Sequence, residues 1–357
     1  MSEITGNKGE WSEFYALVKL LALGILYAAD EDIKPLKNIY FPIKKIFKSE
    51  DNNNIEYTIK NTESIDIFFN DNFMGNLQQT KLKEYAKLLL DKIKAGGNSG
   101  AFEISHAEEI MNDLHCSKIK EPGAKVDISM LLHDIHTGFE PVCGFSIKSE
   151  LGHPPTLLNA SNATNFRYEV KNISPDDVVQ INKFKDKNKI IERIKQIYDR
   201  GGELVFDGIV NTCFENNLTM IDSKMDQILS YLMLYSYKNN VLSCEELADI
   251  AEFENPLNIS KKGFYAYKIK KFLCAVALGL KPSEDWLGQD EANGGYIIVT
   301  SEGNVLAYHI YNRDSFENYL LKNTKLERAS TSRHNYASIY LQGNTYYMNL
   351  NLQIRFK

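Results

Sequence analysis

The chain has 357 residues, of which 43% are hydrophobic and 25% charged, which is typical of a globular protein with one large domain or several smaller ones. Its net charge of −6 excludes a strongly basic nucleic-acid-binding protein but permits a local basic cleft. The five scattered cysteines form no C-x-x-C pair, and the chain shows no signal peptide and no apolar run long enough to span a bilayer. These features predict a reduced, cytoplasmic protein that has no membrane partner.

The first part of the chain predicts, in order, a largely apolar and therefore buried helix, two strands and two amphipathic helices, at 9–24, 39–47, 55–60, 78–96 and 105–115. In the last of these helices Ser105 is the expected N-cap and Glu108 takes the capping-box position. Residues 176–281 predict mostly helices. Residues 294–357 alternate β-branched and aromatic residues around the turns SEGN and QGNT, which predicts hairpins.

Two apolar runs between Lys125 and Gly152 each carry charged residues. Asp127 lies in the first run, and Ser146 and Lys148 lie in the second, on one face, because alternate residues of a strand point the same way. The two runs are expected to form neighbouring antiparallel strands. A carboxylate facing an amine there has a plain explanation, a cross-strand ion pair worth under about 1 kcal/mol when exposed.

A functional explanation is a metal site for phosphodiester hydrolysis. A carboxylate binds Mg²⁺, the metal activates a water molecule, and a lysine orients that water and stabilises negative charge. The order resembles that of the PD-(D/E)XK nucleases, except that Ser146 replaces the second acid. Glu10, at the head of the first helix, is the favoured second metal ligand, Glu13 the alternative and Glu150 a third candidate. Acids in a first helical turn are also explained by the helix dipole, worth about 0.3–1 kcal/mol.

Four blocks spread over the chain resemble the HpaII family of type II restriction endonucleases: GNKGEWSEFYALVKLLA (6–22), GFSIKSELGHPPTLLNASNATNFRYEV (144–170), NGGYIIVTSEGNVLAYHIYNRDSFENYLLKNTKLERASTSRH (293–334) and LNLQIRF (350–356). The resemblance implies Mg²⁺-dependent cleavage of double-stranded DNA at a short palindrome, CCGG in the namesake, with 5′-phosphate and 3′-hydroxyl ends. A homodimer and a protecting cytosine methyltransferase are the implied partners.

In that reading the fold class is α/β, with a restriction-endonuclease-like mixed sheet flanked by helices. We expect a nuclease core at 1–175, a helical region at 176–281 and a β-rich DNA-recognition segment at 282–357. Asp127 would ligate Mg²⁺, Lys148 would orient the nucleophile and Glu10 would complete the metal shell.

Contacts with DNA are expected from polar loops. Arginine paired with guanine is the strongest major-groove contact, so Arg333 and His334 are the first candidates for reading bases. Other donors expected at the DNA are Arg328, Ser330, Thr331, Ser332, Asn335, Asn159, Asn162 and Asn165. Ordinary loop and turn chemistry is the alternative explanation. Two other functions stay open: a repair or recombination nuclease, and a DNA-binding protein that has lost cleavage.

Overall fold

The computed structural model describes residues 4–60, 63–97, 100–120, 125–135, 137–186, 188–309, 313–328 and 336–357. The chain forms two compact units, each built from two segments. One unit comprises Met1–Pro155 and Asp290–Tyr319, and the other comprises Thr156–Gln289 and Leu320–Lys357. No helix in the described ranges is long and apolar enough to cross a membrane.

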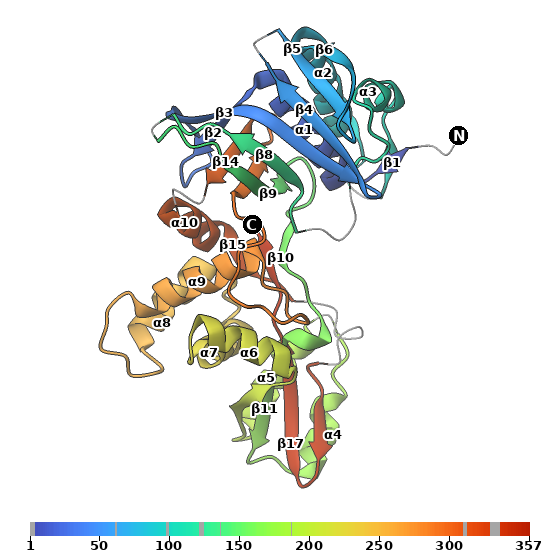
Figure 1. The fold of residues 1–357 in the computed structure, drawn as a ribbon. Coiled ribbons are helices and arrows are strands. Elements are labelled where there is room, and N and C mark those ends of the chain that lie inside the picture. Colours follow the sequence, from blue (N-terminus) through green and yellow to red (C-terminus); the bar gives the residue numbers. More distant parts are fainter. Residues whose placement is uncertain are drawn as a thin grey trace. The chain divides into compact units, whose positions relative to one another are not determined.

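The first unit is built on a mixed sheet, which the described residues form with nine strands in the order β2-β14-β13-β9-β8-β3-β4-β5-β6 (Figure 1). The strands are β2 (Ile25–Ala29), β3 (Pro35–Glu50), β4 (Asn53–Ile59), β5 (Ser64–Phe69), β6 (Asn72–Gln78), β8 (Ile128–Leu132), β9 (Val142–Ser149), β13 (Gly295–Val299) and β14 (Val305–His309). The β13–β9 and β14–β2 pairs are parallel, and the others are antiparallel. The predicted mixed α/β class is confirmed.

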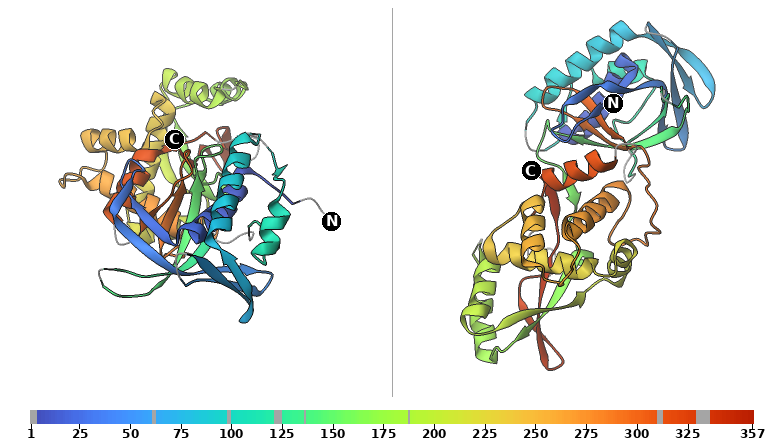
Figure 2. Two further views of the ribbon diagram at one scale, coloured as in Figure 1. Left: turned by 90° about the horizontal axis from the view of Figure 1, so that it is seen from above. Right: turned by 90° about the vertical axis from the view of Figure 1, so that its left-hand side faces the viewer.

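Helices α1 (Lys8–Leu23), α2 (Gln79–Ala95) and α3 (Ala107–Asp113) pack in this unit, which can be followed in two further views (Figure 2). A two-stranded pair, β1 (Thr5–Gly6) with β7 (Phe102–Glu103), lies beside α1. The α1 helix is almost wholly buried, as its apolar circumference predicts, and it packs against α2 and β9. Asn7 caps its start, and Gly24 ends it with a left-handed φ of 65°.

Some details of this unit differ from the expectation, beginning with the start of α3 and the β5–β6 hairpin. The α3 helix begins at Ala107 with His106 as N-cap and no side-chain cap bond, so the predicted Ser105 cap is wrong. His106 takes a left-handed φ of 75°, which turns the chain into the helix without a serine hydroxyl. The β5–β6 hairpin was not predicted, although it pairs along its whole length and carries the sheet to its edge.

The second unit holds a four-stranded sheet of order β12-β11-β17-β16 and a three-stranded sheet of order β10-β18-β15, within the described residues. Its strands are β10 (Thr156–Leu158), β11 (Asn165–Lys171), β12 (Glu203–Ile209), β15 (Thr324–Leu326), β16 (Ile339–Gln342), β17 (Thr345–Asn351) and β18 (Ile354–Phe356). Its helices are η1 (Asn162–Thr164), α4 (Pro175–Asn182), α5 (Lys189–Asp199), α6 (Thr212–Ile221), α7 (Met225–Asn239), α8 (Cys244–Glu254) and α9 (Phe264–Leu278). The α10 helix (Arg313–Asn323) contains the boundary between the units.

The mostly helical middle region is confirmed, with β12 as a strand inside it. Both C-terminal hairpins also form, but they belong to different units. The β13–β14 hairpin joins the first sheet, where Ile298 is the register partner of Lys148, while β16–β17 joins the four-stranded sheet. Residues 282–357 therefore divide between the two units, and the first segment of the first unit ends at Pro155 rather than near residue 175.

Candidate active site

Asp127 stands directly before β8, and its side chain turns toward β9. Its backbone N–H donates to the Phe145 carbonyl at 2.9 Å. One carboxylate oxygen, Oδ2, accepts hydrogen bonds from the Ile147 N–H at 2.7 Å and from the Ser146 hydroxyl at 3.1 Å. The predicted antiparallel pairing of the two strands is confirmed, with Ile128 opposite Phe145. The carboxylate is thus oriented by the neighbouring strand, and its exposed fraction is only 7%.

Lys148 lies two residues beyond Ser146 on the same strand face. Its ammonium group donates to the Ser146 hydroxyl at 3.0 Å, and it lies 5.4 Å from the centre of the Tyr296 ring on β13. Burial lowers the pKa of Lys148, because a desolvated ammonium is disfavoured, while the charges of Asp127 and Glu13 act in the opposite direction. Ser146 therefore links the carboxylate of Asp127 to the amine of Lys148.

The second acid of the site comes from α1. The Glu10 carboxylate accepts the backbone N–H of Asn7 at 2.8 Å and closes the capping box of the helix. Glu13, almost one turn later, lines the same cavity as Asp127 and is 14% exposed. Burial, and then the nearby charge of Asp127, raise the pKa of Glu13 to about 7. The structure brings Glu13 to Asp127, whereas Glu10 is occupied by the helix start.

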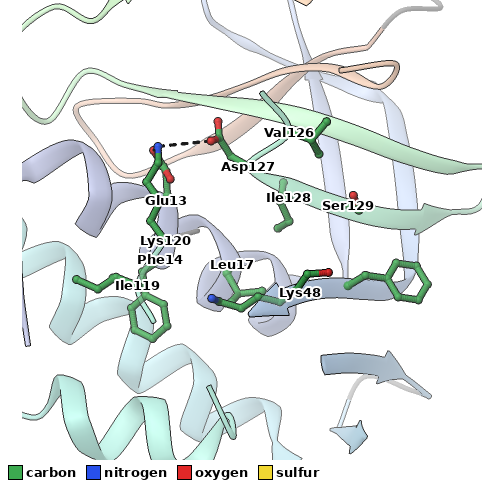
Figure 3. A pocket seen from close by; sticks show the side chains of 12 residues that line it. Glu13, Phe14, Leu17, Lys48, Ile119, Lys120, Val126, Asp127, Ile128 and Ser129 are labelled. Carbon is green, nitrogen blue, oxygen red and sulfur yellow. Dashed lines mark hydrogen bonds and ion pairs between the residues drawn. The ribbon is translucent and has the colours of Figure 1, made fainter. Parts of the chain in front are cut away.

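A further cation in the site, Lys120, had no signal in the sequence analysis. Its ammonium group lies 2.6 Å from Glu13 Oε1 and 3.6 Å from Asp127 Oδ1. Figure 3 shows the Lys120 side chain meeting both carboxylates. Burial opposes the charge of Lys120, but the hydrogen bond to Glu13 and the charges of both acids outweigh it and raise the lysine's pKa. Lys120 lies in a loop with no apolar periodicity, which is why no pattern marks it.

Two cavities border these groups. A cavity of about 270 Å³ is lined by Glu13, Lys120 and Asp127, together with Lys48 and Ser129. A second one, of about 370 Å³, is lined by Glu13 and Lys148, with Lys8, Gly9 and His153. Glu13 lines both cavities, whereas Asp127 lines only the first and Lys148 only the second. Lysines on both walls favour an anionic substrate.

The donor set fits a hard divalent cation. Asp127 and Glu13 offer carboxylate oxygens, and Mg²⁺ is commonly held by one or two carboxylates, water molecules and substrate phosphates. The described residues contain no group of three or more His, Cys, Asp or Glu side chains that could hold a metal. The Glu150 carboxylate, the third candidate, accepts the Ser301 N–H at 3.0 Å and is not among the residues that line either cavity.

A family model for the HpaII restriction endonuclease matches residues 7–356. The chain belongs to the HpaII restriction endonuclease family. The type II restriction enzyme HpaII of Haemophilus parainfluenzae is 39% identical to it over 356 residues, which are 99% of this chain and 98% of that enzyme. No solved structure matches the chain. The resemblance found in the sequence is confirmed, and the chain is a type II restriction endonuclease, a hydrolase that acts on DNA.

Most of the residues expected to read bases in this HpaII-family enzyme lie outside the described residues: Ser330, Thr331, Ser332, Arg333, His334 and Asn335. Arg328 is described, and its guanidinium donates to Asn240 Oδ1 at 2.8 Å and lies over the Tyr237 ring. That arrangement holds Arg328 against the end of α7. A contact with DNA therefore stays a prediction for this loop.

The three asparagines expected near the cut phosphate differ in exposure. Asn159 and Asn162 are exposed. Asn165 is 2% exposed, and its side-chain oxygen accepts a 2.7 Å hydrogen bond from Asn351 on the neighbouring strand β17. Burial inside the sheet gives Asn165 a structural role, and Asn159 and Asn162 remain the members of this set that the HpaII-family enzyme presents to solvent.

Proposed function

We propose that this HpaII-family enzyme hydrolyses double-stranded DNA at a short palindrome, CCGG, and leaves 5′-phosphate and 3′-hydroxyl ends. The resemblance described above supports the site and the products. The observation that supports hydrolysis at this place is that Ser146 joins Asp127 to Lys148 by hydrogen bonds, while Glu13 lines the cavities of both and is linked to Asp127 through Lys120.

Asp127 and Glu13 would hold a Mg²⁺ ion. When bound, such an ion supplies concentrated positive charge and acidifies water. Glu13 takes the part of the acid that the nuclease pattern expects at position 146. The sequence pattern favours Glu10 for this part, but the Glu10 carboxylate accepts the backbone N–H of Asn7 at the start of the helix, so we propose Glu13 instead.

Lys148 would orient the attacking water and stabilise the negative charge that grows on the phosphate oxygens. Its half-buried ammonium group is held by the Ser146 hydroxyl, so little reorganisation is needed when the phosphate arrives. Ser146 positions both Lys148 and Asp127, because its hydroxyl accepts from the first and donates to the second. In-line attack would then break the bond to the 3′ oxygen, which leaves as the 3′-hydroxyl.

A palindrome presents two equivalent strands, which a homodimer with two-fold symmetry would match. We propose that the enzyme acts in this form and that a cytosine methyltransferase protects the host DNA. Sedimentation of the enzyme alone and with a cognate duplex tests whether it acts as a dimer. A monomer that cuts both strands of the duplex would contradict the proposal. Blocked cleavage of a duplex methylated at cytosine tests the protection.

The decisive experiment is digestion of a sequenced plasmid in Mg²⁺, followed by sequencing of the fragment ends. Fragments that all end at CCGG are the expected result, and a continuous smear or ends at another sequence would contradict it. Chelation of the metal should stop cleavage. Asp127→Asn should be inactive, while Asp51→Asn, which changes an exposed acid paired with Lys118, should cut normally.

A further inference from the structure

Lys120 occupies the place between the two acids of the site. Its ammonium group bonds to Glu13 and also faces Asp127, at 2.6 Å and 3.6 Å respectively. Oδ2 of Asp127 is taken by Ser146 and Ile147, so the oxygen that faces Lys120, Oδ1, is the one left to bind a cation. A lysine ammonium and a divalent cation would therefore compete for the same oxygens.

The loop that carries Lys120 is firmly held. Glu50 on β3 is 4% exposed, and its carboxylate accepts the N–H of Ser117 at 2.7 Å and the N–H of Lys118 at 3.2 Å. Lys48 pairs with Glu50 and donates to the Lys118 carbonyl at 2.8 Å. These bonds fix the backbone two residues before Lys120, so its approach to the acids is a built feature of the fold.

We propose that Lys120 is an internal counter-ion that holds the metal site together in the free enzyme and that a divalent cation must displace before cleavage. The inference rests on the proposed function, in which Glu13 and Asp127 bind the metal. The ammonium group offsets part of the negative charge of the two carboxylates and so reduces their repulsion, and the 270 Å³ cavity that Lys120 also lines gives the released side chain room. Lys120 thus sets how much metal the enzyme needs.

Metal binding without DNA tests the proposal directly. Binding of Mn²⁺ to the metal-free full chain is measured by electron paramagnetic resonance for the wild type, Lys120→Met and Lys118→Met. Lys118 is the matched control, because it lies on the same loop and pairs with Asp51 outside the site. Lys120→Met should bind Mn²⁺ about tenfold more tightly than the wild type, which is what loss of one competing charge-assisted hydrogen bond would give. Lys118→Met should bind as the wild type does.

Two further variants separate this proposal from the proposed function. If Asp127→Asn and Glu13→Gln lose the bound Mn²⁺ but Lys120→Met binds no more tightly than the wild type, the site stands and the counter-ion role is wrong. If Mn²⁺ binds equally well to the wild type, Asp127→Asn and Glu13→Gln, the metal site itself lies elsewhere and both proposals are wrong.

A measurement on the wild type covers the case in which Lys120→Met does not fold. The rate at which an amine-acylating reagent modifies Lys120 is compared with that of Lys118 by mass spectrometry, with and without Mn²⁺. Displacement by the metal frees the Lys120 amine, so its rate relative to Lys118 should rise several-fold. An unchanged ratio at saturating Mn²⁺ would show that the ammonium group stays in place and would overturn the proposal.

Discussion

The hydroxyl group of Ser146 accepts a 3.0 Å hydrogen bond from Lys148, in the position where the nuclease pattern expects a second acid. The same hydroxyl donates to Asp127 at 3.1 Å. A neutral side chain here joins the two charged groups without adding a third carboxylate to a site that already holds Glu13. Ser146 therefore bridges the two charged groups, and in the proposed mechanism Glu13 of α1 supplies the missing charge.

Removal of this hydroxyl should slow cleavage without abolishing it. In Ser146→Ala both charged neighbours lose a hydrogen bond, and a bond to a charged group is worth about 1.5–3 kcal/mol, so the rate should fall roughly tenfold to a hundredfold. Asp127 keeps its bond from the Ile147 N–H, so the site should persist. The single-turnover rate at saturating Mg²⁺ measures the effect. Ser146→Thr, which keeps a hydroxyl, is the control, and an undiminished rate in the alanine variant would remove Ser146 from the mechanism.

The two acids of α1 should respond differently to neutralisation. Glu13→Gln should lower the cleavage rate by at least about a hundredfold, the usual cost of losing a preorganised charge at a reacting centre. Glu10→Gln should leave the rate close to that of the wild type and should lower the free energy of unfolding by no more than about 1 kcal/mol, because the capping bond weakens. Cleavage kinetics and thermal unfolding, measured for both variants, test these two predictions. The reverse pattern, with Glu10→Gln inactive, would restore Glu10 as the ligand.

Substitution of Lys148 should separate binding from cleavage. Lys148→Met keeps the length of the side chain but cannot orient water or stabilise phosphate charge, so cleavage should fall by at least about a hundredfold. Specific binding to an uncut cognate duplex in Ca²⁺ should change little. Gel-shift titration and single-turnover cleavage measure the two. Lys45→Met, in which the lost partner is Glu56 on the neighbouring strand β4, is the matched control and should cut normally.

The buried carboxylate of Glu50 should make folding stability depend on pH. Burial alone would raise its pKa, but the hydrogen bonds and charge from Lys48 and the bonds from Ser117 lower it below the ordinary value of 4.5. Because the folded-state pKa is depressed, the carboxylate's contribution is fully present above pH 4.5 and is lost as the pH falls through the folded-state pKa.

Glu50→Gln should therefore be less stable than the wild type by about 3 kcal/mol at neutral pH, because it leaves Lys48 half-buried without its counter-ion. The difference in free energy of unfolding between Glu50→Gln and the wild type should become smaller as the pH is lowered below 4.5. Urea unfolding at a series of pH values measures it. Asp51→Asn changes the next residue, which is exposed, and should have the same free energy of unfolding as the wild type. If Glu50→Gln were less stable than the wild type by the same amount at every pH, the stabilising role of the Glu50 carboxylate would be contradicted.

Local sequence patterns were enough to bring Asp127, Ser146 and Lys148 together on neighbouring strands. The period of two in a strand put Ser146 and Lys148 on one face, and a short connection made the Asp127 strand their neighbour, so the pairing needed no distant information. The apolar circumference of α1 likewise predicted a buried helix, since a helix of that composition has no stable exposed state. Sequence similarity across the chain then identified the family.

The tertiary structure alone decided which acid meets Asp127, that Lys120 joins them as a second cation, and which strand lies beside Lys148. Glu10 and Glu13 lie only about 60° apart around the helix axis, so the packing of α1 on the sheet, and not its sequence period, selects Glu13. Lys120 arrives on a loop held by a buried carboxylate far away in the chain, and β13 joins β9 from more distant residues still. Such contacts depend on how elements pack in three dimensions, which no pattern within a single element records.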